Sequence, residues 1–388
     1  MNLNTELSAD LERWKAAHLH RRARRTDSPP GPWAVMDGRR VLVLASNNYL
    51  GLATHPSVVE AAREAAKVWG AGASGSRLTS GNLDLHESLE RDIADFKHTE
   101  AALLFGSGYE ANTGAIPALA GSDDLILSDQ LNHASLIDGC RLSRAETRVY
   151  RHGDADHVRE LLADRSRFRR CLIVTDGVFS MDGDLAPLPE LHAIASEHGA
   201  WLYVDDAHGV GVLGGAGGGT LEYFGMQPSN VVQMGTLSKA LGASGGYIAG
   251  GRVLIDYLRN AARSFIFTTA PSPAPVAAAR AALRLLRAEP ERREQLSLNA
   301  GHLRALLSQR GLEVPHGVTP IIPILLGSSE RALAVAEALE HAGVWAPAIR
   351  PPTVPDSAAR LRVSVMATHT VEDLERAADA IAEAACPA

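Results

Sequence analysis

The segment Val231-Val232-Gln233-Met234-Gly235-Thr236-Leu237-Ser238-Lys239-Ala240 contains an apolar strand followed by a lysine. The run 231–234 suits a strand covered on both faces, and the glycine-rich stretch 241–246 is a poor helix former. Lys239 therefore lies just beyond a strand, among small residues. A lysine in such a place can lose hydration, which lowers its pKa and makes it an amine nucleophile or a base. Alone, the segment favours an ordinary lysine in a surface turn. The other segments must show whether Lys239 is instead a reactive amine.

The composition is that of a globular protein. Of 388 residues, 46% are hydrophobic and 21% charged, and the net charge of -7 without a long basic run argues against a nucleic-acid binder. Cys140, Cys171 and Cys386 form no CxxC pair, which argues against a disulfide framework or zinc site and favours a reducing compartment. The first residues lack an apolar signal core, and no apolar run approaches ~18 residues. We expect a cytoplasmic protein.

Short apolar runs alternate with helical patterns between residues 51 and 288, which predicts an α/β domain with a mostly parallel central sheet. The predicted strands are 101–105, 125–128, 148–151, 171–175, 201–204, 231–235 and 246–250. The predicted helices are 56–69, 85–97, 109–119, 134–143, 155–163, 188–198 and 274–287.

A second pattern follows the hinge signal Ala288-Glu289-Pro290 and predicts a small α+β domain over 289–388. Its predicted elements are helices 291–309, 329–341 and 371–384 and strands 321–326, 345–349 and 361–365. Residues 1–50 are expected to pack with it, as a helix over 3–25 and a hairpin turning at Asp37-Gly38. The large domain is then 51–288.

Parallel sheets bind ligands at the carboxyl ends of their strands, so the residues after each strand are candidates for a site. Gly108 and Tyr109 open a helix, whose free N–H groups and positive dipole end suit a phosphate. The other candidates at strand ends are His133, Ser180, Asp205, His208, Thr236 and Lys239. Five strand ends would thus bring glycines, histidines, acids and a lysine to one edge. No metal site is expected.

The stretch Gly209–Gly214 matches GxGxxG after a strand and offers a rival interpretation, a nicotinamide-dinucleotide site. Such a site needs a helix opening on the loop and an acid about 20 residues further on. Here more glycines follow at 215 and 217–219 instead. A nicotinamide-dependent oxidoreductase therefore stays a remote alternative.

The motif Asp205-Asp206-Ala207-His208-Gly209, followed by Thr236-Leu237-Ser238-Lys239, resembles the pyridoxal-phosphate (PLP) enzymes of fold type I, and more narrowly the α-oxoamine synthases. The further matches are Ser46–Leu52, Gly72–Arg77, Asn132–Ser135 and Thr175–Asp184. These matches extend over nearly the whole chain, and the motifs occur in the same order as in the family. Ala348-Ile349-Arg350-Pro351-Pro352-Thr353-Val354-Pro355 resembles the 8-amino-7-oxononanoate synthase branch.

The resemblance implies a role for each matched residue in binding PLP. Lys239 would hold the cofactor as a Schiff base and transfer protons, and Asp205 would pair with the pyridine nitrogen. His133 would stack on the ring, and His208 would contact its phenolic oxygen, with Ser180 nearby. Gly108, Tyr109 and Thr236 would bind the phosphate. Lys239, His133, Asp205 and His208 are the implied catalytic residues.

The resemblance also implies where the substrates bind. Arg362, assisted by Asn47, would bind the carboxylate of the amino acid, because guanidinium is the natural clamp for a carboxylate. Arg21 would receive the far carboxylate of a pimeloyl group, and Thr353 would contact the substrate. Thr268 and Thr269 would reach the phosphate of a second subunit in a homodimer.

The implied reaction is the decarboxylative condensation of L-alanine with a pimeloyl thioester in biotin biosynthesis. The acyl carrier is left open between coenzyme A and an acyl carrier protein. Another α-oxoamine synthase, with a different amino acid or acyl thioester, is the first alternative. The oxidoreductase is the second alternative, and a non-catalytic binding protein on the same fold is the third.

Overall fold

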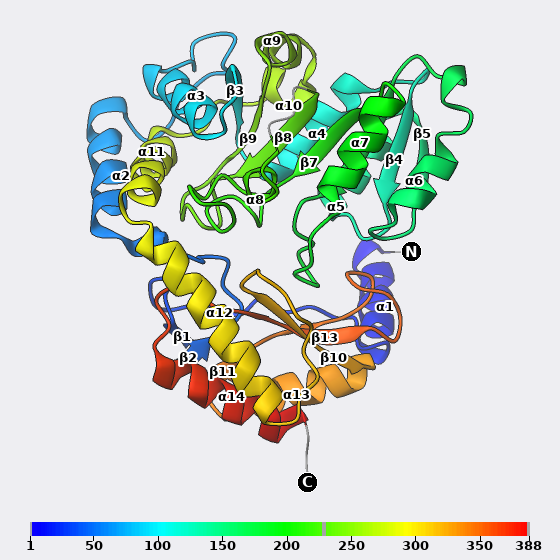
Figure 1. The fold of residues 1–388 in the computed structure, drawn as a ribbon. Helices are drawn as coiled ribbons and strands as arrows, with labels where there is room; N and C mark the ends of the chain where they lie inside the picture. Colours follow the sequence, from blue (N-terminus) through cyan, green and yellow to red (C-terminus); the bar gives the residue numbers. More distant parts are fainter. Residues whose placement is uncertain (1, 227–229, 386–388) are drawn as a thin grey trace. The chain divides into compact units, whose positions relative to one another are not determined.

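The computed structural model describes residues 2–226 and 230–385, and Cys386 lies outside them (Figure 1). The chain divides into two compact units. The small unit comprises Met1–Ser46, Met181–Gly183 and Leu296–Ala388, and the large unit comprises Asn47–Ser180 and Asp184–Gln295. The domain limits expected from the sequence, after residues 50 and 288, stay predictions.

A seven-stranded sheet forms the centre of the large unit, in the order β3-β9-β8-β7-β6-β4-β5. Its strands are β3 (Ala101–Phe105), β4 (Leu125–Asp129), β5 (Glu146–Tyr150), β6 (Cys171–Asp176), β7 (Trp201–Asp205), β8 (Val231–Thr236) and β9 (Gly246–Gly250). Only β9 runs antiparallel to its neighbours within this sheet, β3 and β8. The predicted mostly parallel sheet is confirmed.

Helices cover both faces of this sheet, because alternate side chains of a strand point to opposite sides. Ile126 faces one apolar cluster, whereas Leu125 and Leu127 face the other. The first face carries α4 (Gly108–Leu119), α5 (Ala134–Ser143), α9 (Arg252–Ala261) and α10 (Arg263–Ile266). The second carries α6 (Ala155–Leu161), α7 (Leu188–Glu197) and α8 (Thr220–Tyr223) (Figure 1). Beside the sheet, α11 (Pro273–Ala288) packs against α2 (Pro56–Trp69) and α3 (Asp84–Phe96).

The small unit contains two three-stranded sheets, ordered β1-β2-β11 and β10-β13-β12. The strands are β1 (Trp33–Met36), β2 (Arg39–Val43), β10 (Ile321–Gly327), β11 (Val344–Trp345), β12 (Ala348–Ile349) and β13 (Ala359–Ser364). The helices are α1 (Leu3–Ala16), α12 (Glu291–Gln309), which begins in the large unit, α13 (Ser329–His341) and α14 (Val371–Ala385). Asp37 and Gly38 both have positive φ, 47° and 79°, so the predicted two-residue hairpin turn is confirmed.

Most predicted elements are confirmed, with ends that differ by one or two residues. The helix predicted over 3–25 is wrong beyond Ala16. His18 adopts a left-handed φ of 56°, and the N–H groups of His18 and Leu19 donate to the carbonyls of Lys15 and Trp14. This pattern is a Schellman motif, which ends a helix. Arg21 therefore lies outside any helix or strand and not on a further helical turn.

The single strand predicted over 345–349 is also wrong. Val344–Trp345 pairs with β2, whereas Ala348–Ile349 pairs with β13 in the other sheet. Pro347 lies between the two strands and has no N–H to donate to a ladder. The short helices α8, α9 and α10 were not predicted from the sequence. Within the described ranges, no helix is both long and apolar enough to cross a membrane.

Candidate active site

Two predicted residues from different loops meet at the carboxyl ends of the central strands. Lys239 follows β8, His208 follows β7, and Lys239 Nζ lies 2.9 Å from His208 Nε2. Both residues belong to the large unit. The strand order brings them together, since β7 and β8 are parallel neighbours that end at the same edge. Lys239 is half-buried, so its amine is accessible from that edge.

His208 is held from its other side by a residue that sequence reasoning missed. The hydroxyl of the fully buried Tyr49 lies 2.7 Å from His208 Nδ1 and donates to Asn47 Oδ1 over 3.2 Å. An ammonium on Lys239 can only donate, so Nε2 of His208 accepts and its Nδ1–H donates to Tyr49. From Lys239 to Asn47, each group thus donates a hydrogen bond to the next one. Tyr49 lies in the matched stretch Ser46–Leu52, but nothing in the sequence shows its partner.

Asp205, the last residue of β7, is buried with both carboxylate oxygens hydrogen-bonded. Its Oδ2 accepts from Asn112 Nδ2 at 2.7 Å, and its Oδ1 accepts from the N–H of Ala207 at 3.0 Å. Hydrogen bonds to both oxygens fix the plane of the carboxylate. Asn112 comes from α4, and its contact with Asp205 was not predicted.

His133 is the N-cap of α5 and is held by its backbone and its ring. Its N–H donates to Asp176 Oδ2 at 2.7 Å, and its Nδ1 accepts from the N–H of Ser135 at 3.2 Å. Burial lowers the pKa of His133, so the imidazole is neutral. Burial, and then the nearby Asp205, raise the pKa of Asp176.

The first turn of α4, the candidate anion site, lies beside the end of β8. The N–H groups of Gly108 and Tyr109 have no acceptor within the helix, because the first turn has no preceding helical carbonyls. A Cβ on Gly108 would lie 3.6 Å from Thr236 Oγ1, and that hydroxyl lies 2.8 Å from Ser238 Oγ. A Cβ on Gly246 would lie 2.6 Å from the N and Cα of Gly108. The lack of a side chain at Gly246 thus allows the first turn of α4 to approach the start of β9.

The other predicted site residues are distributed between the units. Ser180 lies in the loop after β6, and Thr268 and Thr269 follow α10, all in the large unit. Arg21, Thr353 and Arg362 belong to the small unit, where Arg21 and Thr353 are exposed. Arg362 is buried on β13 and donates to Ser364 Oγ at 2.8 Å. The roles expected for these residues stay predictions.

The glycine-rich loop after His208 has a structural explanation. It packs around the buried carboxylate of Asp206, whose Oδ2 lies 3.4 Å from Nζ of the equally buried Lys97. A Cβ on Gly209 would lie 2.0 Å from Asp206 Oδ1, and one on Gly219 would lie 1.7 Å from Oδ2. The next helix, α8, has four residues and begins only at Thr220. The loop therefore lacks the helix that a dinucleotide site requires.

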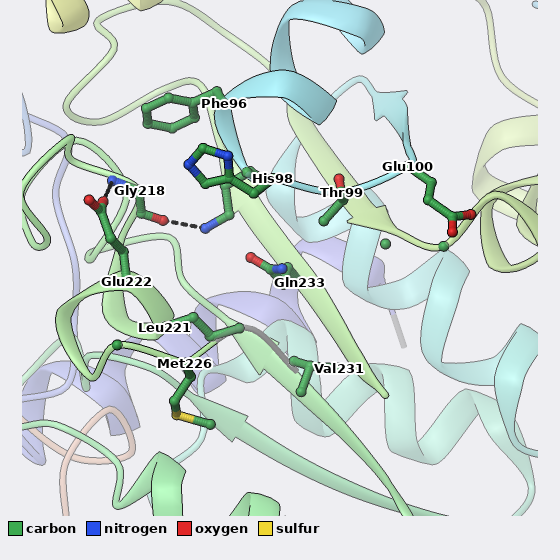
Figure 2. A pocket seen from close by; sticks show the side chains of 14 residues that line it. Phe96, His98, Thr99, Glu100, Gly218, Leu221, Glu222, Met226, Val231 and Gln233 are labelled. Atoms are coloured by element: carbon green, nitrogen blue, oxygen red, sulfur yellow. Dashed lines mark hydrogen bonds between the residues drawn. The ribbon is translucent and has the colours of Figure 1, made fainter. Parts of the chain in front are cut away.

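A cavity of about 480 Å3 lies at the opposite ends of the strands, near the start of β8 and the end of β9 (Figure 2). Phe96, His98, Glu222 and Gln233 are among its lining side chains, and Lys97 reaches its wall by donating to the carbonyl of Gly218. The predicted site residues do not line it.

Comparisons with known proteins agree with this arrangement. The chain matches the family described as aminotransferase class I and II over residues 39–381. It is 49% identical over 377 residues to the 8-amino-7-oxononanoate synthase of Geobacter metallireducens, covering 97% of this chain and 96% of that protein. It is 48% identical over 375 residues to 8-amino-7-oxononanoate synthase 2 of Bacillus subtilis, again covering 97% and 96%.

A solved structure gives the same result for the fold. The serine palmitoyltransferase of S. paucimobilis, with a bound PLP–myriocin aldimine, matches with a TM-score of 0.92 at 31% identity, over 99% of this chain and 98% of that one. Because the matches extend over nearly the whole chain, the protein belongs to the aminotransferase class I and II family, and the predicted kinship with the fold type I α-oxoamine synthases is confirmed.

Proposed function

We propose that this protein is an 8-amino-7-oxononanoate synthase, which condenses L-alanine with a pimeloyl thioester and releases CO2 and the thiol. The observation that carries the proposal is the contact between Lys239 and His208 beside the α4 anion site, in a chain about half identical to enzymes of that name. The reaction would be a step of biotin biosynthesis. A cytoplasmic location stays a prediction.

The residues at this edge of the sheet fit PLP. The fit is supported by the packing at the α4 N-terminus, where a Cβ at Gly246 would lie 2.6 Å from the backbone N of Gly108. The N–H groups of Gly108 and Tyr109 and the hydroxyl of Thr236 would hold the phosphate. Asp205 would pair with the ring nitrogen, His133 would lie against the ring, and His208 and Ser180 would hold the phenolic oxygen. Lys239 would bind the aldehyde carbon.

When bound, PLP supplies an electron sink that lets the Cα of an amino acid lose a proton. The protein must place a base at that proton and hold the ring nitrogen in its charged form. Lys239 Nζ lies 2.9 Å from His208 Nε2, and once its ammonium has released a proton, the free amine would be the group that takes up the Cα proton. Asp205, with both oxygens fixed, would keep the ring nitrogen protonated.

Substrate recognition would come from guanidinium groups. Arg362 would bind the alanine carboxylate with the help of Asn47, whose Oδ1 already accepts from Tyr49. Arg21 would bind the distal carboxylate of the pimeloyl group, and its exposure leaves its side chain accessible. Thr353 would contact the substrate. In the proposed homodimer, Thr268 and Thr269 of the partner subunit would add phosphate contacts.

The test is an assay of the purified protein with PLP, L-alanine and pimeloyl-coenzyme A or pimeloyl-acyl carrier protein. We expect 8-amino-7-oxononanoate by mass spectrometry, with release of CO2, and no product from the Lys239→Ala variant. Turnover of glycine or L-serine in preference to L-alanine would reassign the chain to another α-oxoamine synthase. A colourless protein that reduces NAD and binds no PLP would instead support the oxidoreductase.

A further inference from the structure

Asn112, which no motif singled out, lies at the centre of a buried hydrogen-bond network in the candidate active site. The side chains of Asn112 and Tyr203 are fully buried, and Ser135 is buried beside them. Asn112 Nδ2 lies 2.7 Å from Asp205 Oδ2 and 2.8 Å from Ser135 Oγ. Tyr203 Oη donates to Asn112 Oδ1 over 2.8 Å. The amide thus contacts two elements, β7 through Asp205 and Tyr203 and the first turn of α5 through Ser135.

The chemistry of the partners fixes the orientation of this amide. The carboxylate of Asp205 can only accept, so the NH2 group of Asn112 must face it and the carbonyl must face Tyr203. An NH2 group has two protons. One is donated to Asp205 and the other to Ser135 Oγ, so both donors and the acceptor of the amide are used.

Donors and acceptors can be assigned in the same way between Ser135 and His133. Because Ser135 Oγ accepts from Asn112, its own proton is available for His133 Nδ1, which lies 2.8 Å away. The N–H of Ser135 also donates to Nδ1. Two donors on one ring nitrogen require that nitrogen to be unprotonated. His133 is therefore a neutral imidazole with its proton on Nε2.

We propose that Asn112 is a positioning residue, which orients the Asp205 carboxylate directly and directs the Ser135 hydroxyl toward His133 Nδ1, where it adds to the backbone N–H that supports the Nε2–H tautomer. The inference rests on the proposed function, in which Asp205 and His133 both contact PLP. A single amide would then fix the carboxylate that faces the ring nitrogen together with the imidazole that lies against the ring.

The test combines two measurements on the full chain: the PLP dissociation constant, and the 15N NMR shifts of histidine-labelled protein without PLP. His86 and His369 serve as internal references, because each accepts a backbone N–H at Nδ1 and contacts a carbonyl through Nε2. The variants are Asn112→Leu and Ser135→Ala. Thr113→Ala, the next residue on α4, is the matched control, since its hydroxyl bonds only its own helix at Tyr109.

We expect the wild-type His133 shifts to match the two references at pH 7. Asn112→Leu should raise the PLP dissociation constant roughly 10- to 100-fold, the range for losing one hydrogen bond to a charged group. Ser135→Ala removes the hydroxyl but keeps the N–H that donates to His133 Nδ1, so the Nδ1 shift of His133 should move while the ring stays the Nε2–H tautomer and the His86 and His369 shifts stay unchanged. If Asn112→Leu does not fold, Tyr203→Phe should raise the constant roughly 2- to 10-fold, because it removes one neutral hydrogen bond.

Either of two results would overturn the proposal: His133 as the Nδ1–H tautomer or imidazolium in the wild type, or a folded Asn112→Leu variant with wild-type PLP affinity. If the wild type binds no PLP, the proposed function fails. The change in the His133 shifts on replacing Ser135 in the PLP-free protein then still decides whether the Ser135 hydroxyl binds the ring.

Discussion

Lys239 and His208 are 31 residues apart in the chain, yet their side-chain nitrogens Nζ and Nε2 lie 2.9 Å apart. The lysine amine is thereby oriented by an imidazole that is itself held by Tyr49. Lys239, His208 and Tyr49 thus connect three segments of the large unit.

Replacing Lys239 tests the assignment of the reactive amine. Lys239→Ala should abolish the visible absorption of protein-bound PLP and lower turnover by at least roughly 10²- to 10⁴-fold, the usual range for a general base. Absorption spectra and product assays measure the two effects. Lys67→Ala, an exposed lysine on α2 that pairs with Glu64, is the control and should change neither. Normal turnover by Lys239→Ala would defeat the proposed function.

Tyr49→Phe tests whether the orientation of His208 matters for catalysis. The change removes one hydroxyl that contacts His208 Nδ1, so kcat should fall roughly 2- to 10-fold while PLP affinity changes little. Tyr247→Phe is the matched control, because among the described residues the buried hydroxyl of Tyr247 has no hydrogen-bond partner. Steady-state kinetics of both variants decide the matter, and equal kcat values would show that the contact is not used.

Gly246→Ala tests the close approach of α4 to the end of β8. The new Cβ would lie 2.6 Å from backbone atoms of Gly108, so the first turn of α4 must move. We expect the PLP dissociation constant to rise roughly tenfold, or about 1.4 kcal/mol, measured by titration of PLP-free protein. Gly121→Ala is the control, because a Cβ there meets nothing within 4 Å. Unchanged affinity in Gly246→Ala would place the phosphate elsewhere.

Arg362→Ala tests the proposed carboxylate clamp. Loss of a charge-assisted pair should raise the KM for L-alanine roughly 10- to 100-fold and leave PLP bound. Arg362→Lys keeps the charge without the two-pronged geometry and should lie between the variant and the wild type. The KM values and the absorption of bound PLP are measured for all three proteins. An unchanged KM would remove Arg362 from the substrate site.

Stability should depend on pH through His152, which lies between Asp129 and Asp184 at 2.9 and 2.8 Å. Burial opposes the charge, but the hydrogen bonds to the two carboxylates outweigh it and raise the pKa of His152 from 6.5 to about 10. A raised pKa in the folded state stabilises the protein fully below pH 6.5, and this contribution is lost as the pH approaches 10.

His152→Asn should therefore lower Tm most near pH 6, by the equivalent of about 1–3 kcal/mol, and much less near pH 10. Thermal unfolding from pH 6 to pH 10 measures the difference, with the exposed His20→Asn as control. A difference in Tm that is constant with pH would mean that His152 is not charged in the folded protein.

The sequence predicts those features that depend on local pattern. The strands near Lys239 and Asp205 are continuous apolar runs, and the turn at Asp37-Gly38 needs two residues with positive φ, so both could be read from single segments. The residues at strand ends were also identified, because the direction of parallel strands determines where those ends gather. The end of α1 was not predicted, since a histidine at the left-handed position is an uncommon stop signal.

Partners distant in the chain could not be predicted. Asn112 is an unremarked polar residue in a helix, and only the packing of α4 on the sheet brings it to Asp205, 93 residues away. Tyr49 and His208 are likewise separated by 159 residues. A GxGxxG pattern gave a competing interpretation, because glycines required by a buried carboxylate and glycines required by a phosphate look the same in a sequence.

The packing of Gly209 and Gly219 against Asp206 has a consequence for how this loop can vary. A side chain at either glycine collides with the carboxylate, and loss of the carboxylate leaves Lys97 buried with its charge uncompensated. Single substitutions at these four positions should therefore be rejected in a mutational library, whereas combined replacements can survive. The loop is best treated as one coupled unit, so directed evolution there should randomise the four codons together.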